Sequence, residues 1–426
     1  LAIPSASGAE LRKISSKAQK IGIQVKTVPG IFNFLDGSTW KPNLRDISIE
    51  DLLRREPIQL DQQRLRSIVT EKVVLVTGAG GSIGSEIARQ VCGLLPSRVV
   101  LLGRGENSLW ESERQLRSLF PNQQLSIELC DIRNSRRLGQ AFKRWRPDIV
   151  FHAAAHKHVP FLEQHPEEAV ENNILGTRNI LDASILAGVN YFVNISTDKA
   201  VNPTNVLGAS KRIAEMLVAE ASHRVPEGGL YVSVRFGNVL GSRGSVVPIF
   251  QRQIQNGGPL TITHPEMTRY FMTIPEASQL VLQAGLLGET GKVYVLDMGS
   301  PVRILDLAKD MIQLSGLVPD QDIEIHVSGI RPGEKLFEEL FYGEAHRSQV
   351  HPKVFEAKFA DQIEAFELSK QLQHMEEILA LPDPPRRHDL IQSLCALVPG
   401  YVPSQMGAGQ WLSPQSKAGK PPIVSV

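Results

Sequence analysis

Three residues that could transfer protons stand together at the end of a predicted strand. The stretch YFVNIS, residues 191–196, is followed directly by Thr197, Asp198 and Lys199. Ligands of open α/β sheets bind at the carboxyl ends of the strands, so these side chains lie where a substrate is expected. A carboxylate can act as a general acid or base, but a lysine can act as a base only if its pKa is lowered. The alternative is a plain turn with a surface ion pair between Asp198 and Lys199.

A glycine-rich turn follows an earlier predicted strand. Val73–Val76 is an unbroken apolar run, which is typical of a strand buried on both faces. Three glycines at three-residue spacing then lead into a segment with helical periodicity. A tight strand-to-helix turn also favours glycine for steric reasons alone. The combination of strand, glycines and helix nevertheless predicts that a dinucleotide pyrophosphate binds at the helix N-terminus, on Gly78, Gly81, Ser82, Ile83 and Gly84.

The ends of three further strands bear on which dinucleotide binds. An acidic residue normally ends the second strand and binds the adenosine ribose, whereas an arginine there accommodates a 2′-phosphate. Here Gly103 occupies the acidic position. Arg104 favours NADP, while Glu106 could reach a ribose from a variant loop, so both cofactors stay open. At the next two strand ends we expect a contact with adenine and a close approach of the backbone, from Asp131, Ile132, Ala153, Ala154 and Ala155. A surface turn and ordinary close packing are the alternatives there.

A parallel sheet is needed to bring these residues together. From Glu71 onward, predicted strands alternate with helical stretches, as a doubly wound sheet requires. After Asn238, Pro and Gly become frequent, as expected of a smaller lobe that closes over a substrate. We therefore predict an α/β fold, a Rossmann-type doubly wound parallel sheet with a smaller C-terminal substrate-binding lobe.

Five segments are predicted along the chain. Residues 1–45 look like the end of an N-terminal nucleotide-binding-like domain, and a small independent cap is the alternative. Residues 46–70 form a charged connector. Residues 71–345 form the dinucleotide-binding core, with the substrate lobe mainly in 238–345. A helical extension over 346–403 and a disordered Ser/Gly/Pro/Lys tail over 404–426 complete the chain.

Composition excludes several classes of function. The chain has 46 Lys and Arg against 45 Asp and Glu, so no basic surface indicates nucleic-acid binding. Its three cysteines, Cys92, Cys130 and Cys395, have no metal-ligand spacing and favour a reducing compartment. No apolar stretch approaches the length of a membrane span. The chain begins at Leu1 rather than Met, which suggests that something upstream has been removed.

Two histidines follow the fourth strand of the core. His156 and His158 flank Lys157, but no third ligand has suitable spacing, so we expect no metal site. Lys157 and His158 are expected to shape a substrate site, whereas His156 is equally well a surface residue. Glu163 is a weaker candidate for the same site.

Seven sequence blocks, in order, resemble one group within the extended short-chain dehydrogenase/reductase superfamily. The blocks are VTGAGGSIGSE, FHAAAHKHVP, ENNILGT, STDKAVNPTNVLGASKR, RFGNVLGSRGSVVPIF, MTRYFMTIPEA and GIRPGEKLFEEL. The group is that of the polysaccharide-biosynthesis nucleotide-sugar 4,6-dehydratases, whose usual substrate is UDP-N-acetylglucosamine. The resemblance implies a lyase with a tightly bound, internally recycled NAD or NADP. Long members carry membrane helices upstream, which implies a membrane-anchored full-length protein on the cytoplasmic face.

The resemblance also implies roles for the first three residues. Thr197 would hydrogen-bond the C4 hydroxyl of the sugar, Asp198 would transfer a proton at the C6 oxygen, and Lys199 would remove the C5 proton. Lys211 would bind the nicotinamide ribose. The superfamily's usual tyrosine is absent, because Leu207 stands four residues before Lys211. Asp198 would then also serve the C4 hydroxyl.

The substrate would be held by residues from several segments. A guanidinium pairs with diphosphate oxygens in bidentate fashion, and a carboxylate accepts hydrogen bonds from sugar or ribose hydroxyls. Surface ion pairs are the alternative at each position, and Arg269 is open between substrate contact and packing of the lobe. The expected substrate-binding residues are Lys157, His158, Asn238, Arg252, Arg331 and Glu334.

Two other functions remain possible from the sequence. A UDP-sugar 4-epimerase shares the cofactor and the oxidation at C4 but needs no acid and base for elimination. A non-catalytic dinucleotide sensor would explain the missing tyrosine. Asp198 and Lys199 favour the dehydratase over the epimerase. Lys211, together with Thr197, Asp198 and Lys199, counts against the sensor. By resemblance, we also expect a homo-oligomer.

Overall fold

The computed structural model describes residues 1, 3, 8–21, 23, 25–27, 45–53, 61–225, 227–342, 347–357, 363–381 and 386–403. The tail predicted from 404 lies outside the described residues, as does most of the segment 1–45.

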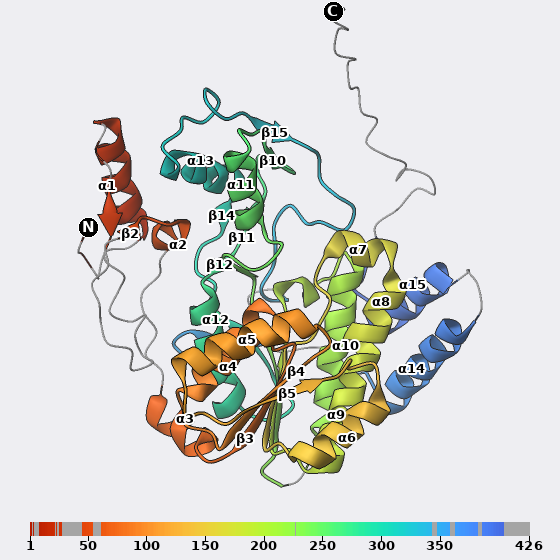
Figure 1. Ribbon diagram of the computed structural model, residues 1–426. Coiled ribbons are helices and arrows are strands. Elements are labelled where there is room, and N and C mark those ends of the chain that lie inside the picture. Colours follow the sequence, from red (N-terminus) through yellow and green to blue (C-terminus); the bar gives the residue numbers. More distant parts are fainter. Residues whose placement is uncertain are drawn as a thin grey trace, which may run out of the picture.

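A nine-stranded sheet forms the centre of the molecule (Figure 1), in the order β16-β17-β13-β8-β7-β6-β3-β4-β5. Pairing is parallel from β13 to β5. β17 and β16 join the β13 edge in antiparallel fashion. The predicted Rossmann-type α/β fold is confirmed. The strands are β3 (Val73–Thr77), β4 (Arg98–Gly103), β5 (Leu125–Leu129), β6 (Ile149–His152), β7 (Tyr191–Ile195), β8 (Leu230–Arg235), β13 (Val293–Leu296), β16 (Arg347–His351) and β17 (Val354–Ala357).

Helices cover both faces of this sheet because its strands are apolar on both sides. Val74 and Val76 point into the core shared with α3 (Gln62–Val69), α4 (Ser82–Cys92), α5 (Glu106–Leu119) and α12 (Ile274–Leu287). Leu75 points into the opposite core. That second face is covered by α6 (Ser135–Trp145), the π-helical segment η2 (Ala169–Leu175), α9 (Gly176–Ala187) and α10 (Val206–Ala221). The short helices α7 (Val159–Gln164) and α8 (Pro166–Glu168) lead into this layer.

A separate apolar cluster holds the smaller lobe. It centres on α11 (Val246–Gln255) and α13 (Ile304–Leu314), and it includes Leu11, Ile49 and Leu52 from the N-terminal part. The N-terminal elements therefore pack on the lobe. They are α1 (Gly8–Lys20), β1 (Lys26–Thr27), β2 (Arg45–Asp46) and α2 (Ile49–Leu52). The short strands of the lobe and its junction with the core are β9 (Asn238–Val239), β10 (Leu260–Ile262), β11 (Thr268–Arg269), β12 (Phe271–Met272), β14 (Val302–Arg303) and β15 (Ile325–Val327).

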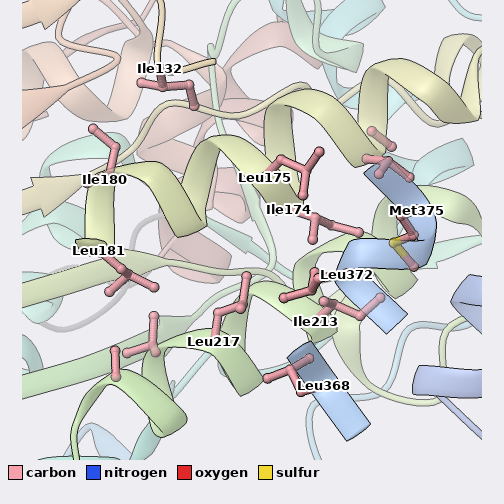
Figure 2. Close-up of a cluster of buried hydrophobic side chains, with 14 of the residues drawn as sticks. Ile132, Ile174, Leu175, Ile180, Leu181, Ile213, Leu217, Leu368, Leu372 and Met375 are labelled. Carbon is pink, nitrogen blue, oxygen red and sulfur yellow. The ribbon is translucent and has the colours of Figure 1, made fainter. Parts of the chain in front are cut away.

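The C-terminal segment differs from the predicted helical extension. Residues 347–357 form β16 and β17, because the apolar side of β17 completes the sheet beside β13. Helices follow only afterwards, as α14 (Ala365–Ala380) and α15 (Arg386–Leu397). Figure 2 shows Leu368, Leu372 and Met375 of α14 directed toward Ile213 and Leu217 of α10. The chain thus covers the outer face of α9 and α10 with its own C-terminal helices.

None of the described helices is long and apolar enough to cross a membrane.

Candidate active site

The glycine-rich turn joins β3 to α4 at the carboxyl end of the sheet. Gly78 has φ +63°, and a Cβ there would lie 2.7 Å from the backbone nitrogen of Ala154. A Cβ at Gly84 would lie 2.3 Å from the carbonyl oxygen of Gly78. Both glycines are therefore required for the turn to pack against itself and against the end of β6.

Gly81 differs from its two neighbours. A Cβ there would meet only the Gly78 oxygen, at 3.2 Å, a tight contact that a shift of a few tenths of an ångström would relieve. Gly81 is also the N-cap of α4 and provides no side-chain cap, which leaves the first N–H groups of the helix available. An open backbone approach beside a helix N-terminus fits a bound pyrophosphate.

Arg104 and Asp131, two of the residues predicted to contact the adenosine part of the cofactor, lie close together. The Arg104 guanidinium lies 3.7 Å from the Asp131 carboxylate and 3.3 Å from His156 Nε2. Burial would raise the pKa of Asp131, but hydrogen bonds from Arg133 outweigh burial and hold that pKa below its ordinary value. Glu106 is exposed in the first turn of α5.

Thr197, Asp198 and Lys199 form a connected group after β7. A short 3₁₀ turn, η3 (Asp198–Ala200), brings the side chains of Thr197 and Lys199 to the same carboxylate oxygen of Asp198. Thr197 Oγ1 donates to Asp198 Oδ1 at 2.9 Å, and Lys199 Nζ donates to the same oxygen at 3.0 Å. Asp198 Oδ2 is buried and has no hydrogen-bond partner among the described residues. The Asp198 side chain is 0% exposed, so this pair is not a surface ion pair.

The charge of Lys199 is controlled by more than Asp198. Its Nζ lies 3.3 Å from Asn238 Oδ1 and 3.7 Å from Glu338 Oε1. Burial would lower the pKa of Lys199, but the carboxylates of Asp198 and Glu338 outweigh burial and raise it. This arrangement holds a charged ammonium and does not give the lowered pKa that a base requires.

At Lys211, burial outweighs the neighbouring negative charge, so the pKa of this lysine is lowered. Helix α10 begins at Val206, with Asn205 as its side-chain cap, so Lys211 lies in the second turn rather than at an exposed helix start. Lys211 is 4% exposed, and its ammonium has no hydrogen-bond partner in the part of the chain that the structure describes. Burial lowers its pKa to about 8, against the opposing charge of Glu215. Leu207 is buried in the apolar cluster and offers no proton-transfer group.

A family model described as polysaccharide biosynthesis protein matches residues 74–359, which include the glycine-rich turn, Thr197 to Lys199 and Lys211. The chain belongs to this family. The resemblance drawn from the sequence blocks is thereby confirmed at the level of the family.

Several known proteins are similar to most of the chain. The capsular polysaccharide biosynthesis protein CapD of Staphylococcus aureus is 50% identical over 84% of this chain and 60% of its own length. The probable polysaccharide biosynthesis protein EpsC of Bacillus subtilis is 48% identical over 85% of this chain and 60% of its own length. The chain thus spans about 60% of these relatives. A UDP-glucose 4-epimerase of Rickettsia massiliae is 36% identical over 64% of this chain and 79% of its own length.

Solved structures share the fold of this family member. Pen from Bacillus thuringiensis has a TM-score of 0.63 and 34% identity, over 69% of this chain and 91% of that one. The UDP-glucose 4-epimerase of Thermus thermophilus in complex with NAD has a TM-score of 0.53 and 25% identity, over 62% and 88%. DesIV of Streptomyces venezuelae, a dTDP-glucose 4,6-dehydratase, has a TM-score of 0.54 at 22% identity, over 63% and 87%, which shows the fold alone.

Only some of the predicted substrate-binding residues have contacts that tie them to the active-site residues or to the loop after β9. Asn238 joins Lys199, as described above. Lys157 donates through Nζ to the backbone oxygen of Arg243 at 2.7 Å, and His158 contacts the neighbouring Gly244. Arg252, on α11, and Arg331 are exposed. Glu334 is bound to Arg331 through backbone contacts.

Glu163 has a structural role at the start of α10. Its Oε1 accepts a hydrogen bond from the Val206 backbone nitrogen at 2.7 Å, and so Glu163 fixes the start of α10. Among the described residues, no group of three His, Cys, Asp or Glu is arranged to hold a metal ion.

Sequence reasoning missed a buried support beneath the active-site residues. Ser196 Oγ and Arg235 Nε both donate to Glu215 Oε1 at 2.6 Å. Arg212 donates to the other oxygen of Glu215 at 3.2 Å. Arg235 and Glu215 have side chains that are 0% exposed. These residues fix the end of β7 to β8 and α10, the helix that carries Lys211. An acidic residue four positions after Lys211 is the one signal that the sequence contained.

Sequence reasoning also missed Arg243. Its Nη1 donates to the backbone oxygen of Gly80 at 2.9 Å, and its Nη2 donates to Glu111 at 3.0 Å. Its backbone nitrogen donates to Ser82 Oγ at 3.2 Å. The loop after β9 is therefore tied across the glycine-rich turn.

Proposed function

We propose that this chain is a nucleotide-sugar 4,6-dehydratase that converts UDP-N-acetylglucosamine to its 4-keto-6-deoxy form. The observation that carries the proposal is the state of Asp198. One of its oxygens is held by Thr197 and Lys199, and the other is buried without a partner among the described residues. A buried, unpaired carboxylate oxygen is costly unless a ligand group meets it. A sugar hydroxyl is such a group.

The three neighbouring residues supply what elimination of water requires. Asp198 takes the proton of the C4 hydroxyl and later gives a proton to the departing C6 oxygen. Thr197 orients the C4 hydroxyl. Lys199 removes the C5 proton as the neutral amine, after its ammonium has given its proton to water once Asp198 is neutralised. A positioned acid and base of this kind typically contribute 10²–10⁴-fold, on the order of 3–5 kcal/mol.

We infer that the chain uses NAD or NADP. When bound, the nicotinamide would accept a hydride from C4 of the sugar and return one at C6, so the cofactor ends as it began. Gly78, Gly81 and the first turn of α4 would hold the pyrophosphate. Lys211 would donate to the nicotinamide ribose, which gives its ammonium the partner that the described residues lack. Support for NAD comes from the Thermus thermophilus epimerase, whose structure contains it.

A 4-epimerase is the second candidate, because the chain is 36% identical to a UDP-glucose 4-epimerase. Epimerisation shares the oxidation at C4 but requires no general acid for a leaving C6 hydroxyl. The buried Asp198–Lys199 pair favours the dehydratase. Asp198 could serve the C4 hydroxyl in either reaction, but a base for the C5 proton, the role proposed for Lys199, has no task in epimerisation.

Product mass separates the two functions. Purified protein supplied with NAD or NADP and UDP-N-acetylglucosamine is expected to give a product lighter by one water. A product of unchanged mass but altered C4 configuration would replace the proposal with an epimerase. Unchanged substrate would leave a dinucleotide-binding protein without this activity.

Asp198→Asn tests the assignment of the acid. The amide keeps the shape but cannot exchange the proton, so loss of water should fall by at least about 10²-fold while cofactor affinity is retained. Asp182→Asn, an exposed residue of α9 paired with Arg224, is the matched control. Near-normal turnover of Asp198→Asn would remove Asp198 from the mechanism.

We further propose that the product enters surface-polysaccharide or glycan synthesis, in line with the names of CapD and EpsC. The full-length protein is proposed to be a homo-oligomer anchored at the cytoplasmic face of a membrane. Membrane fractionation of full-length protein, and the mass of the purified chain in solution, test these two points.

A further inference from the structure

Glu338 is buried beside the active-site residues, although its sequence position indicated nothing. The residue is 8% exposed and lies in the segment that follows Arg331 and Glu334. Its Oε1 is 3.7 Å from Lys199 Nζ and 3.7 Å from Arg269 Nε. Its Oε2 is buried and, within the described ranges, has no hydrogen-bond partner.

Arg269 holds this segment in place. Its Nη1 donates to the backbone oxygens of Thr268 and Leu336, at 2.7 and 3.2 Å, and its Nη2 donates to that of Lys335 at 2.8 Å. Arg269 is itself 8% exposed. Because a buried arginine fixes the backbone on the N-terminal side of Glu338, the carboxylate is held at a defined place relative to Lys199. The contacts of Arg269 in the structure are packing contacts, and its role toward a substrate stays a prediction.

Two carboxylates and two cations therefore form one buried group. Asp198 and Glu338 approach Lys199, while Arg269 approaches Glu338. We propose that Glu338 is a positioning residue, which acts through Lys199 by keeping its ammonium charged and directed at Asp198 before the sugar binds. This inference rests on the proposed function for its meaning in catalysis, but its test does not.

The physical consequence follows from the number of anions around Lys199. With both carboxylates ionised, the ammonium is favoured over the amine, although burial and the charge of Arg269 oppose this. When Asp198 takes the proton of the sugar C4 hydroxyl, one of the two anions is neutralised. The ammonium then exchanges its proton with water more readily, and Glu338 is the anion that remains beside it. Glu338 thus raises the pH above which Lys199 can serve as base.

The chain contains a matched control in the next residue. Glu339 is also a carboxylate, but it is exposed and pairs with Lys335 at 2.8 Å and with Asn202 at 2.8 Å. Glu338→Gln and Glu339→Gln remove the same charge one position apart. Only the first removes it from the surroundings of Lys199.

The experiment is a direct titration of Lys199 without substrate. Protein labelled with ¹³C-lysine is followed by NMR at Cε as pH rises, and the Lys199 signal is identified by its loss in Lys199→Arg. An opposite charge at this distance shifts a pKa by about 1–3 units. Glu338→Gln is therefore expected to move the Lys199 midpoint down by about 1–3 pH units, with no movement in Glu339→Gln. Equal midpoints in the two variants would overturn the inference.

Two further measurements keep the test decisive. If Glu338→Gln does not fold, Glu338→Asp takes its place. The shorter side chain moves the carboxylate away from Lys199 by one methylene, so the Lys199 midpoint should shift down by a smaller amount. No shift of the midpoint would overturn the inference. In the wild type and Glu338→Gln, the acid limb of the pH profile of kcat should move with the midpoint, while KM stays nearly unchanged. Failure of the dehydratase assay in the wild type would reject the proposed function and leave the titration result intact.

Discussion

The glycine-rich turn offers two substitutions that separate folding from cofactor binding. Both are Gly→Ala, three residues apart, so the added volume is the same. At Gly84 the new Cβ would lie 2.3 Å from the Gly78 oxygen, whereas at Gly81 the nearest atom is that same oxygen at 3.2 Å. Gly81 has φ −84° and ψ 166°, which alanine adopts without strain.

The two variants should differ in stability for this steric reason. Real Cβ atoms essentially never approach closer than 3.0 Å, so the backbone around Gly84 must separate by about 0.7 Å. Overpacking of this kind costs about 1–3 kcal/mol in the free energy of unfolding. Gly81→Ala should stay within about 1 kcal/mol of the wild type, because a small loss at the N-cap is offset by a less flexible unfolded chain. Its effect should instead be on pyrophosphate binding, weakened at least about tenfold, which is about 1.4 kcal/mol.

Urea unfolding without cofactor and calorimetric titration with NAD and NADP measure the two effects separately. Gly84→Ala should lose stability, and Gly81→Ala should lose cofactor affinity at nearly unchanged stability. The steric reasoning would be refuted by a Gly84→Ala protein as stable as the wild type. Unchanged affinity in Gly81→Ala would refute the assignment of the pyrophosphate to this turn.

Three further predictions concern charges around the site. In cofactor-free protein, Lys211→Met should be more stable than the wild type at neutral pH, by on the order of 3 kcal/mol, because the native state bears a buried ammonium. In the wild type, Lys211 has a pKa of about 8 when folded and 10.5 when unfolded. The stability of the wild type should therefore rise between pH 8 and 10.5, and the advantage of the variant should shrink. A constant difference in stability across a pH series would contradict this. Arg235→Met leaves Glu215 with one cation fewer and should lower the free energy of unfolding by about 3–5 kcal/mol, with partial recovery on adding Glu215→Leu; denaturant unfolding of the single and double variants decides. Arg243→Ala should release bound dinucleotide faster than the surface control Arg303→Ala in a stopped-flow chase, and equal rates would remove Arg243 from cofactor retention.

Local sequence patterns were sufficient for most of the fold. The strands VVLVT and YFVNIS were placed correctly, because an apolar β-branched run between turn residues has few other solutions. Within the extension over 346–403, which is predicted to be helical, residues 347–357 form a pair of strands. Its β17 pairs with β13, whose residues lie about sixty positions earlier, and no local signal marks such a partner.

In the candidate site, too, residues that are neighbours in the sequence could be predicted, and a residue distant in the sequence could not. Thr197, Asp198 and Lys199 are neighbours in the sequence, so their adjacency after a strand could be inferred directly. Glu338 could not, because it approaches Lys199 only through a segment that returns from the far lobe.

The sequence by itself determined the glycine turn, the alternation of strands and helices in the core, and the cluster of acid and base that follows one strand. Periodicity and turn chemistry act over a few residues, so these features can be inferred locally. Only the tertiary structure decided the ionisation of Lys199 and Lys211. The charge of a buried amine depends on which carboxylates the fold brings within a few ångströms and on how much water it excludes. One lysine meets two anions and keeps its proton, whereas the other lies in a dry helix–sheet junction and holds its proton weakly.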